Sequence, residues 1–324
     1  MVRCCAMSSE MQRADGRLPA HVRLVRRSAL ILPVNVPGFV ERAHLRGADA
    51  IVLDLEDSVP QEEKGNARRA IPEALRIAEG GGVPVLVRVN DKFPDLIRDL
   101  DACVRPELDE VVLPKVETPD QVKVLEALLA ERELKSRLPE GKIGVNLLIE
   151  SALGLERASS IVRAGTRVAT VSLGSEDLMR ELNADTGPAG DEFLWAHGRI
   201  IMAAYASGVT PLGFPGTIAE YTDLEGLRRA VARGRSMGYV GGYCIHPRQV
   251  RVLNEGFSPT DEQVEWARRV VEAFSLSIAD GRSSTSLEGK MIDAPVADRA
   301  RSILERKRAV EAIEDCKPSG GPRG

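Results

Sequence analysis

Residues 51–57 read IVLDLED, and this stretch decides the fold. A branched apolar run that ends in acids is typical of a buried parallel strand with functional groups at its carboxyl end. The arrangement recurs in VPVLVRVN with Arg88, EVVLPK with Lys115, GVNLLIE with Glu150, TVSLGSED with Asp177 and YCIHP with His246. Because the loops after the strands of a parallel α/β barrel converge on one face, we expect these side chains to share a pocket. The pattern therefore predicts an enzyme.

Apolar strand-like runs alternate with amphipathic segments such as 121–138, whose apolar residues recur at spacings of three and four. The predicted strands are 28–32, 50–54, 84–89, 110–113, 143–149, 168–173, 208–212 and 239–245. The glycine fingerprint of a dinucleotide fold is absent from the sequence. The alternation predicts a (β/α)8 TIM barrel with a C-terminal helical extension rather than an open doubly wound sheet.

The ends of the chain differ in composition from the barrel. Residues 1–22 are predicted to be a flexible leader, 23–258 the catalytic barrel, 259–315 a helical extension or lid, and 316–324 a disordered tail. Within the extension, helices are predicted at 261–275 and 296–314. The polar stretch DGRSSTSLEGK between them is predicted to be flexible.

Composition limits the function classes. The net charge of −4 comes from interspersed acids and bases, and aromatic residues make up 4% of the 324 residues, which argues against a nucleic-acid partner. No apolar run reaches the roughly 18 residues that a membrane span needs. We therefore expect a soluble, cytoplasmic protein with small-molecule partners and no membrane or nucleic-acid partner.

Several blocks resemble the citrate lyase beta-subunit and malyl-CoA lyase family, in family order and over about residues 26–312. They are RRSALILP, GADAIVLDLEDSV, VLVRVN, VVLPKVE, LIESALGL, VSLGSEDL, YCIHPRQV and GKMIDAP. The resemblance implies a Mg²⁺-dependent lyase that makes or breaks a carbon–carbon bond in a 3-hydroxy-dicarboxylyl or citryl thioester of coenzyme A. It also implies an acyl-CoA and a 2-oxo acid as partners, and a homo-oligomer, a trimer or hexamer.

Glu150 and Asp177 are the predicted metal ligands, since carboxylates that follow neighbouring strands can hold Mg²⁺ together with water and substrate oxygens. The alternative is that either carboxylate only caps a helix. Arg88 leaves a strand of Val and Leu, so its guanidinium needs an anion or a carbonyl oxygen. The resemblance implies that Arg88 binds the substrate and stabilises the enolate of the acyl thioester. The alternative is an internal ion pair with Asp54 or Glu56.

Glu56 is predicted to support the metal site, with Asp54 structural. Lys115 is expected to pair with Glu56 or Glu150 rather than to form a Schiff base. Arg27 and Arg42 are the predicted contacts of the coenzyme A phosphates, although Arg42 could equally belong to a solvated face. The family's usual LFVPG turn is replaced here by LILPV, which leaves free coenzyme A or an acyl-carrier protein as the thioester carrier.

Asp293, in EGKMIDAP, is given the role of general acid/base by the resemblance, acting in the active site of a neighbouring subunit; the alternative is a helix N-cap. His246 is expected to make a structural hydrogen bond, and the divergent loop 210–223 is expected to affect substrate preference. Three other functions stay open at this point. They are a malyl-CoA-type thioesterase, a citrate lyase beta-like subunit that needs an acyl-carrier partner, and a 2-oxo acid aldolase that does not use coenzyme A.

Overall fold

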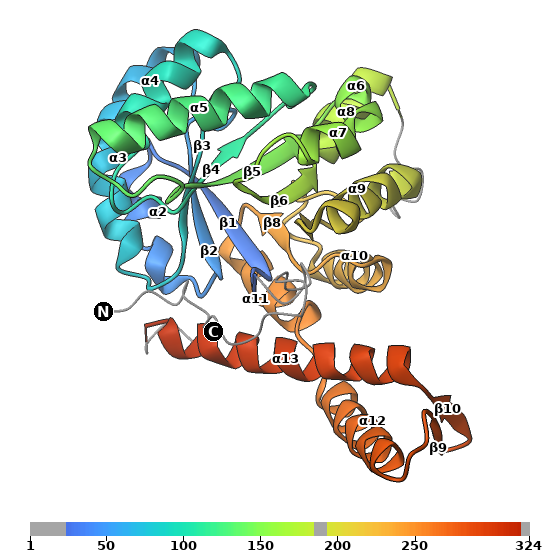
Figure 1. Cartoon of the computed structure of the whole chain (residues 1–324). Helices are drawn as coiled ribbons and strands as arrows, with labels where there is room; N and C mark the ends of the chain where they lie inside the picture. Colours follow the sequence, from blue (N-terminus) through green and yellow to red (C-terminus); the bar gives the residue numbers. More distant parts are fainter. Residues whose placement is uncertain (1–23, 185–192, 319–324) are drawn as a thin grey trace. The chain divides into compact units, whose positions relative to one another are not determined.

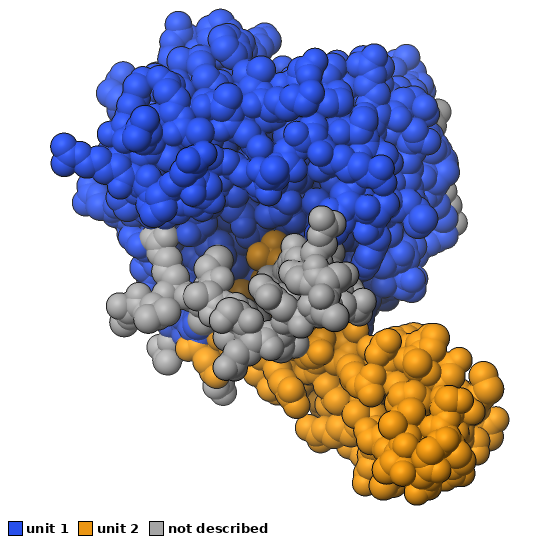
Figure 2. Space-filling view, in the orientation of Figure 1, with its two compact units in different colours: residues 1–6, 26–257, 316–324 blue, residues 7–25, 258–315 orange. Residues whose placement is uncertain are grey.

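The computed structural model describes residues 24–184 and 193–318, so the predicted leader lies outside the described residues. The chain divides into two compact units, coloured separately in Figure 2. Among described residues, the first unit holds 26–184, 193–257 and 316–318, and the second holds 24–25 and 258–315. None of the described helices is long and apolar enough to cross a membrane.

The first unit is built on an eight-stranded parallel sheet in the order β7-β6-β5-β4-β3-β2-β1-β8. Its strands are β1 (Ser28–Pro33), β2 (Ala50–Asp54), β3 (Val85–Arg88), β4 (Glu110–Leu113), β5 (Gly144–Ile149), β6 (Val168–Leu173), β7 (Thr210–Leu212) and β8 (Gly242–Cys244). The Gly213 N–H donates to the Gly241 carbonyl at 2.7 Å and the Val240 N–H to the Pro211 carbonyl at 3.4 Å, which links the β7 and β8 edges. The predicted (β/α)8 barrel is confirmed.

Helices surround the strands (Figure 1). They are α2 (Pro37–Val40), α3 (Lys64–Glu79), α4 (Phe93–Cys103), α5 (Pro119–Lys135), α6 (Ala152–Glu156), α7 (Ala158–Val162), α8 (Ser175–Leu182), α9 (Leu194–Ser207), α10 (Leu224–Met237) and α11 (Pro247–Gly256), with 3₁₀ turns η1 (Ala43–Leu45) and η2 (Gln61–Glu63). α5 begins where the Thr118 side chain accepts the Gln121 N–H in a capping box, just before Pro119.

Strand alternation separates two cores. On β6, Val171 and Leu173 belong to the large core between strands and helices. Leu148 and Leu212, on the two neighbouring strands, belong to a smaller core inside the barrel. A barrel filled from both faces in this way holds each strand end in a fixed position, which is what a site built from several strands requires.

β7 and β8 each start two or three residues later than the sequence predicted, for one reason. Gly208 and Gly238 end α9 and α10 in the left-handed conformation, with φ of 68° and 118°. A glycine at that position is a helix C-cap, so β7 and β8 start only after the chain has left the cap.

The second unit contains α12 (Asp261–Ala279), β9 (Thr285–Leu287), β10 (Lys290–Ile292) and most of α13 (Ala294–Cys316). The prediction of a flexible stretch between the helices is wrong, because β9 and β10 form an antiparallel hairpin. Glu288 and Gly289 both have positive φ, 51° and 75°, as a tight two-residue hairpin turn requires. The unit has its own small core of Ala267, Val270, Phe274, Ile292, Ala297 and Ala300.

Candidate active site

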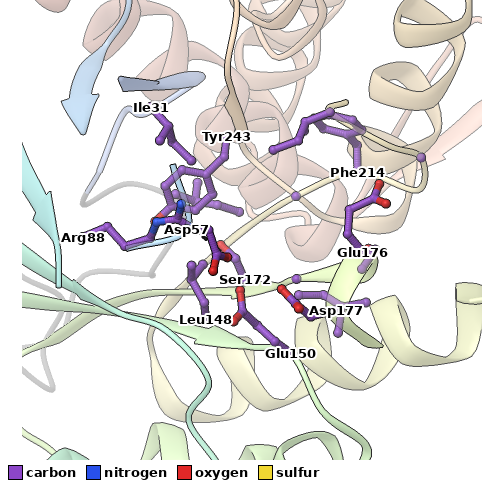
Figure 3. A pocket seen from close by; sticks show the side chains of 17 residues that line it. Ile31, Asp57, Arg88, Leu148, Glu150, Ser172, Glu176, Asp177, Phe214 and Tyr243 are labelled. Atoms are coloured by element: carbon purple, nitrogen blue, oxygen red, sulfur yellow. Dashed lines mark ion pairs between the residues drawn. The ribbon is translucent and has the colours of Figure 1, made fainter. Parts of the chain in front are cut away.

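A pocket of about 230 Å³ lies at the carboxyl ends of the barrel strands (Figure 3). Residues of six strands and of the loops after the strands line it. These are Ile31, Asp57, Arg88, Leu148, Glu150, Ser172, Leu173, Gly174, Ser175, Glu176, Asp177, Leu212, Gly213, Phe214, Gly216, Ile218 and Tyr243. The pocket therefore contains the strand-end residues Arg88, Glu150 and Asp177 that the sequence predicted would meet.

Arg88 is the last residue of β3 and lies in register with Asp54 at the end of β2. Its Nε and Nη2 donate to Asp54 at 2.6 and 2.7 Å, and its Nη1 lies 3.1 Å from Glu56 Oε2. Burial opposes ionisation of Asp54, but the Arg88 guanidinium and the Ser58 hydroxyl outweigh it and hold the Asp54 pKa below its usual value. This bidentate pair fixes the guanidinium plane at the pocket wall.

Lys115 follows β4 in the left-handed conformation, with φ of 52°. Its Nζ pairs with Glu56 and lies 3.2 Å from Asp57 Oδ1, while its backbone N–H donates to Glu150 Oε2 at 3.2 Å. The expected ion pair with Glu56 is present. These carboxylates raise the Lys115 pKa above its ordinary value despite partial burial, which opposes a Schiff-base role.

Glu150 and Asp177 both direct carboxylates into the pocket (Figure 3). Glu150 follows β5 and is 6% exposed, and Asp177 is in the first turn of α8, 2.5 Å from Arg180 Nη2. Burial, and then the negative charges of Glu56 and Asp177, raise the pKa of Glu150 to about 7. Such a desolvated group of acids is stabilised when a cation neutralises it.

The donor set fits Mg²⁺. In residues 24–184 and 193–318 no cluster of three or more His, Cys, Asp or Glu has metal-site geometry, so a cation here would have two protein ligands, Glu150 and Asp177. Mg²⁺ accepts one or two carboxylates and completes its octahedron with water and substrate oxygens. The buried Glu150 and the half-buried Asp177, with open space beside them, meet that requirement.

Other predicted residues lie outside this pocket. Arg27, just before β1, is at the opposite end of the barrel, where its Nε and Nη2 donate to Asp49 at 2.8 Å each. The Lys317 ammonium also contacts Asp49, at 2.7 Å. Arg27 is thus part of a buried ion pair, and the geometry lends no support to a coenzyme A contact there. Arg42 is exposed in the segment between β1 and β2, just before η1.

Asp293 belongs to the second unit. Its Oδ1 accepts the Val296 N–H at 3.2 Å, so it caps the start of α13. His246 caps α11, where its Nδ1 accepts the Arg248 N–H at 3.1 Å, and its ring stacks on Tyr221. The structural hydrogen bond expected of His246 is confirmed.

The sequence reasoning missed several pocket residues. Ser172 and Tyr243 face inward from β6 and β8, and strict strand alternation could have identified both. Gly213, Phe214, Gly216 and Ile218 come from the loop after β7 and line the pocket wall. This loop lies within the 210–223 segment, whose composition gave no sign of which residues face the site.

Comparison with known proteins agrees with the geometry. Residues 27–247 match the family described as HpcH/HpaI aldolase/citrate lyase. The chain is 36% identical over 282 residues to the citrate lyase subunit beta of Escherichia coli K12, covering 87% of this chain and 93% of that protein. It is 31% identical over 310 residues to the L-malyl-CoA/beta-methylmalyl-CoA lyase of Rhodobacter capsulatus, covering 89% and 96%.

Among solved structures, CitE of Mycobacterium tuberculosis in complex with magnesium, acetoacetate and coenzyme A is similar. Its TM-score is 0.69 at 28% identity, with 87% of this chain and 97% of that chain covered. Three observations lead to one assignment. The barrel carries acids and an arginine at its strand ends, the family matches residues 27–247, and the relatives are carbon–carbon lyases. The chain belongs to the HpcH/HpaI aldolase/citrate lyase family and is a lyase-family enzyme.

Proposed function

We propose that this protein is a Mg²⁺-dependent acyl-CoA lyase that cleaves or forms the carbon–carbon bond of a malyl-, citramalyl- or citryl-type thioester. One observation carries the proposal: the fixed guanidinium of Arg88 and the acids Glu150 and Asp177 line the same pocket. Relatives named citrate lyase subunit beta and malyl-CoA lyase, and a similar structure that holds magnesium and coenzyme A, support the choice of reaction.

The chain's residues would divide the work as follows. Glu150 and Asp177 would hold Mg²⁺, which would supply a Lewis acid to the substrate. Arg88 donates hydrogen bonds to the thioester oxygen, whose negative charge grows as the enolate forms. Asp54 keeps the guanidinium in orientation through two hydrogen bonds of 2.6 and 2.7 Å. Glu56 and Lys115 balance the charge beside it, and Arg42 contacts the carrier phosphates.

Protonation of the enolate carbon requires an acid, and Asp293 is the proposed donor. The GKMIDAP block that contains Asp293 resembles the family's block whose acid reaches a neighbouring active site, so we propose that Asp293 acts on a neighbouring subunit in a trimer or hexamer. Asp293→Ala and Glu150→Ala, each inactive alone, should then regain part of the activity when co-assembled. Verified mixed oligomers without recovery, or an active monomer, would contradict catalysis in trans.

The reaction is tested with malyl-, methylmalyl-, citramalyl- and citryl-CoA, with products identified by mass spectrometry. A lyase releases a shorter acyl-CoA and a 2-oxo acid, while a thioesterase releases the intact hydroxy acid and coenzyme A. An aldolase that does not use coenzyme A would act on free acids and show no coenzyme A binding in calorimetry.

A second candidate is favoured by the relatives themselves, several of which are named as subunits of citrate lyase. A subunit of that kind would turn over a citryl thioester only on an acyl-carrier protein. Binding of coenzyme A esters without turnover, and turnover after a carrier protein is added, would select it.

A further inference from the structure

Ser172 is a buried hydroxyl on the pocket side of β6. It is 2% exposed, lines the pocket, and lies in register with Leu148 on β5 and Leu212 on β7. Within the described residues its Oγ has no hydrogen-bond partner. A buried hydroxyl without a partner lowers stability relative to alanine, so its presence requires a compensating contact.

Among the described residues, the Tyr243 hydroxyl, which also lines the pocket, likewise has no partner, whereas the two buried hydroxyls of Thr170 and Ser28 are satisfied internally. Thr170, two residues earlier on the same face of β6, donates to Asn146. Ser28, at the start of β1, donates to Asn254 Oδ1 at 2.7 Å and accepts the Asp49 N–H at 3.2 Å. Ser172 differs from both because its hydroxyl lies at the cavity, where a bound molecule can supply the partner (Figure 3).

The surroundings restrict what that molecule offers. Apart from Arg88, the inward-facing strand residues of the pocket form what we call the pocket floor: Ile31, Leu148, Ser172, Leu212 and Tyr243. Its three aliphatic members give no hydrogen bonds, so a polar substrate atom there depends on the hydroxyls. The strands on which Ser172 and Leu148 lie continue directly into the segments that carry Asp177 and Glu150.

We infer that Ser172 Oγ donates a hydrogen bond to a carboxylate or oxo oxygen of the bound 2-oxo acid, which makes Ser172 a specificity-determining residue for that substrate. This inference rests on the proposed lyase function. The oxo acid is assigned, rather than the thioester, because Ser172 is on the strand that leads to the metal ligand Asp177. Carboxylate and oxo oxygens accept hydrogen bonds only, so the hydroxyl is the donor.

The test compares Ser172→Ala with Ser28→Ala, a matched loss of one buried hydroxyl. In the condensation direction, Ser172→Ala should raise the KM for the 2-oxo acid by roughly tenfold to a hundredfold, the usual range for a hydrogen bond to a charged group. The KM for the acyl-CoA should stay within twofold, and the melting temperature should not fall. Ser28→Ala should lower the melting temperature and leave both KM values unchanged.

An unchanged KM for the oxo acid, or an equal rise in both KM values, would overturn the assignment of Ser172. Calorimetry of glyoxylate, pyruvate and oxaloacetate with MgCl₂ separates this outcome from failure of the proposed function. If the wild type binds an oxo acid but turns over no thioester, the lyase proposal fails. In that case, weaker binding of the oxo acid by Ser172→Ala supports the Ser172 assignment, and unchanged binding overturns it. If the wild type binds none of the three acids, both proposals fail.

Discussion

Gly174 lies directly against Glu150. A Cβ atom built on Gly174 would be 2.5 Å from Glu150 Cγ and 2.6 Å from its Oε1, while the Gly174 N–H donates to the Ile149 carbonyl at 2.9 Å. The side chain of the predicted metal ligand therefore occupies the space that any other residue at position 174 would need. Backbone conformation does not explain the glycine in VSLGSED, because its φ of −87° is open to every residue. The close approach of Glu150 is what requires it.

Gly174→Ala should displace Glu150 and lower kcat/KM by about 100-fold, because a shift of roughly 1 Å in a catalytic group has that effect. Mg²⁺ affinity should fall in parallel, as measured by calorimetry. Gly198→Ala in α9 is the control, since a Cβ there meets nothing within 4 Å. Normal Mg²⁺ affinity in Gly174→Ala would show that Glu150 is not held by this contact or is not a ligand.

Glu150→Gln and Asp177→Asn should each abolish turnover and weaken Mg²⁺ binding, because each replaces a charged carboxylate ligand with a neutral amide of nearly the same shape. Without Mg²⁺, Glu150→Gln should melt at the wild-type temperature or above it, since repulsion from Glu56 and Asp177 is lost. The stabilisation that Mg²⁺ gives the wild type should disappear in both variants. Asp120→Asn, an exposed acid on α5, is the control; activity at low Mg²⁺ in the site variants would refute the metal assignment.

Arg88→Lys should reduce kcat by about 10²–10³-fold, the usual cost of removing one donor to a developing oxyanion. An ammonium keeps the charge but cannot bind Asp54 through two parallel hydrogen bonds while also facing the substrate. Steady-state kinetics with the best thioester measure the effect. Arg132→Lys in α5, where the guanidinium binds Asp101 and Glu131 outside the pocket, should keep full activity. Equal loss in both variants would point to a general effect on folding.

Protein stability should depend on His197 in mild acid. His197 is buried in α9 with its Nδ1 2.8 Å from the Tyr239 hydroxyl, and burial lowers its pKa from 6.5 to about 4. As the pH falls below 6.5 the unfolded chain gains a proton that the folded protein does not, so the free energy of unfolding decreases. This decrease in the free energy of unfolding is complete near pH 4 and amounts to about 3 kcal/mol at most.

Urea denaturation at pH 7 and pH 4.5 measures this effect. His197→Gln, which cannot be protonated but can still bond to Tyr239, should lose about 2 kcal/mol less than the wild type between the two pH values. Equal losses in the two proteins would assign acid sensitivity to the carboxylates instead.

The sequence by itself determined the fold, and it identified the two central acids of the site and its arginine. Alternating apolar runs and helical segments specify a parallel barrel, and residues that end strands of such a barrel face the same opening. For that reason Arg88, Glu150 and Asp177 could be placed in one pocket although they are far apart in the chain. The second unit's hairpin was not predicted from the sequence. Its turn places Glu288 at positive φ, where Asn, Asp or Gly would be the usual sequence signal.

Only the tertiary structure decided how these residues fit together. The β5–β6 register shifts between Val145 and Asn146, which brings Ile149 beside Leu173 and so Glu150 beside Gly174. Lys115, whose backbone is left-handed, contacts both Glu56 and Glu150, and Arg27 is paired with Asp49. Local periodicity fixes the face on which a side chain lies, but the register between strands and the conformation of the loops fix its neighbours. These arise from packing between segments distant in sequence, which no local pattern encodes.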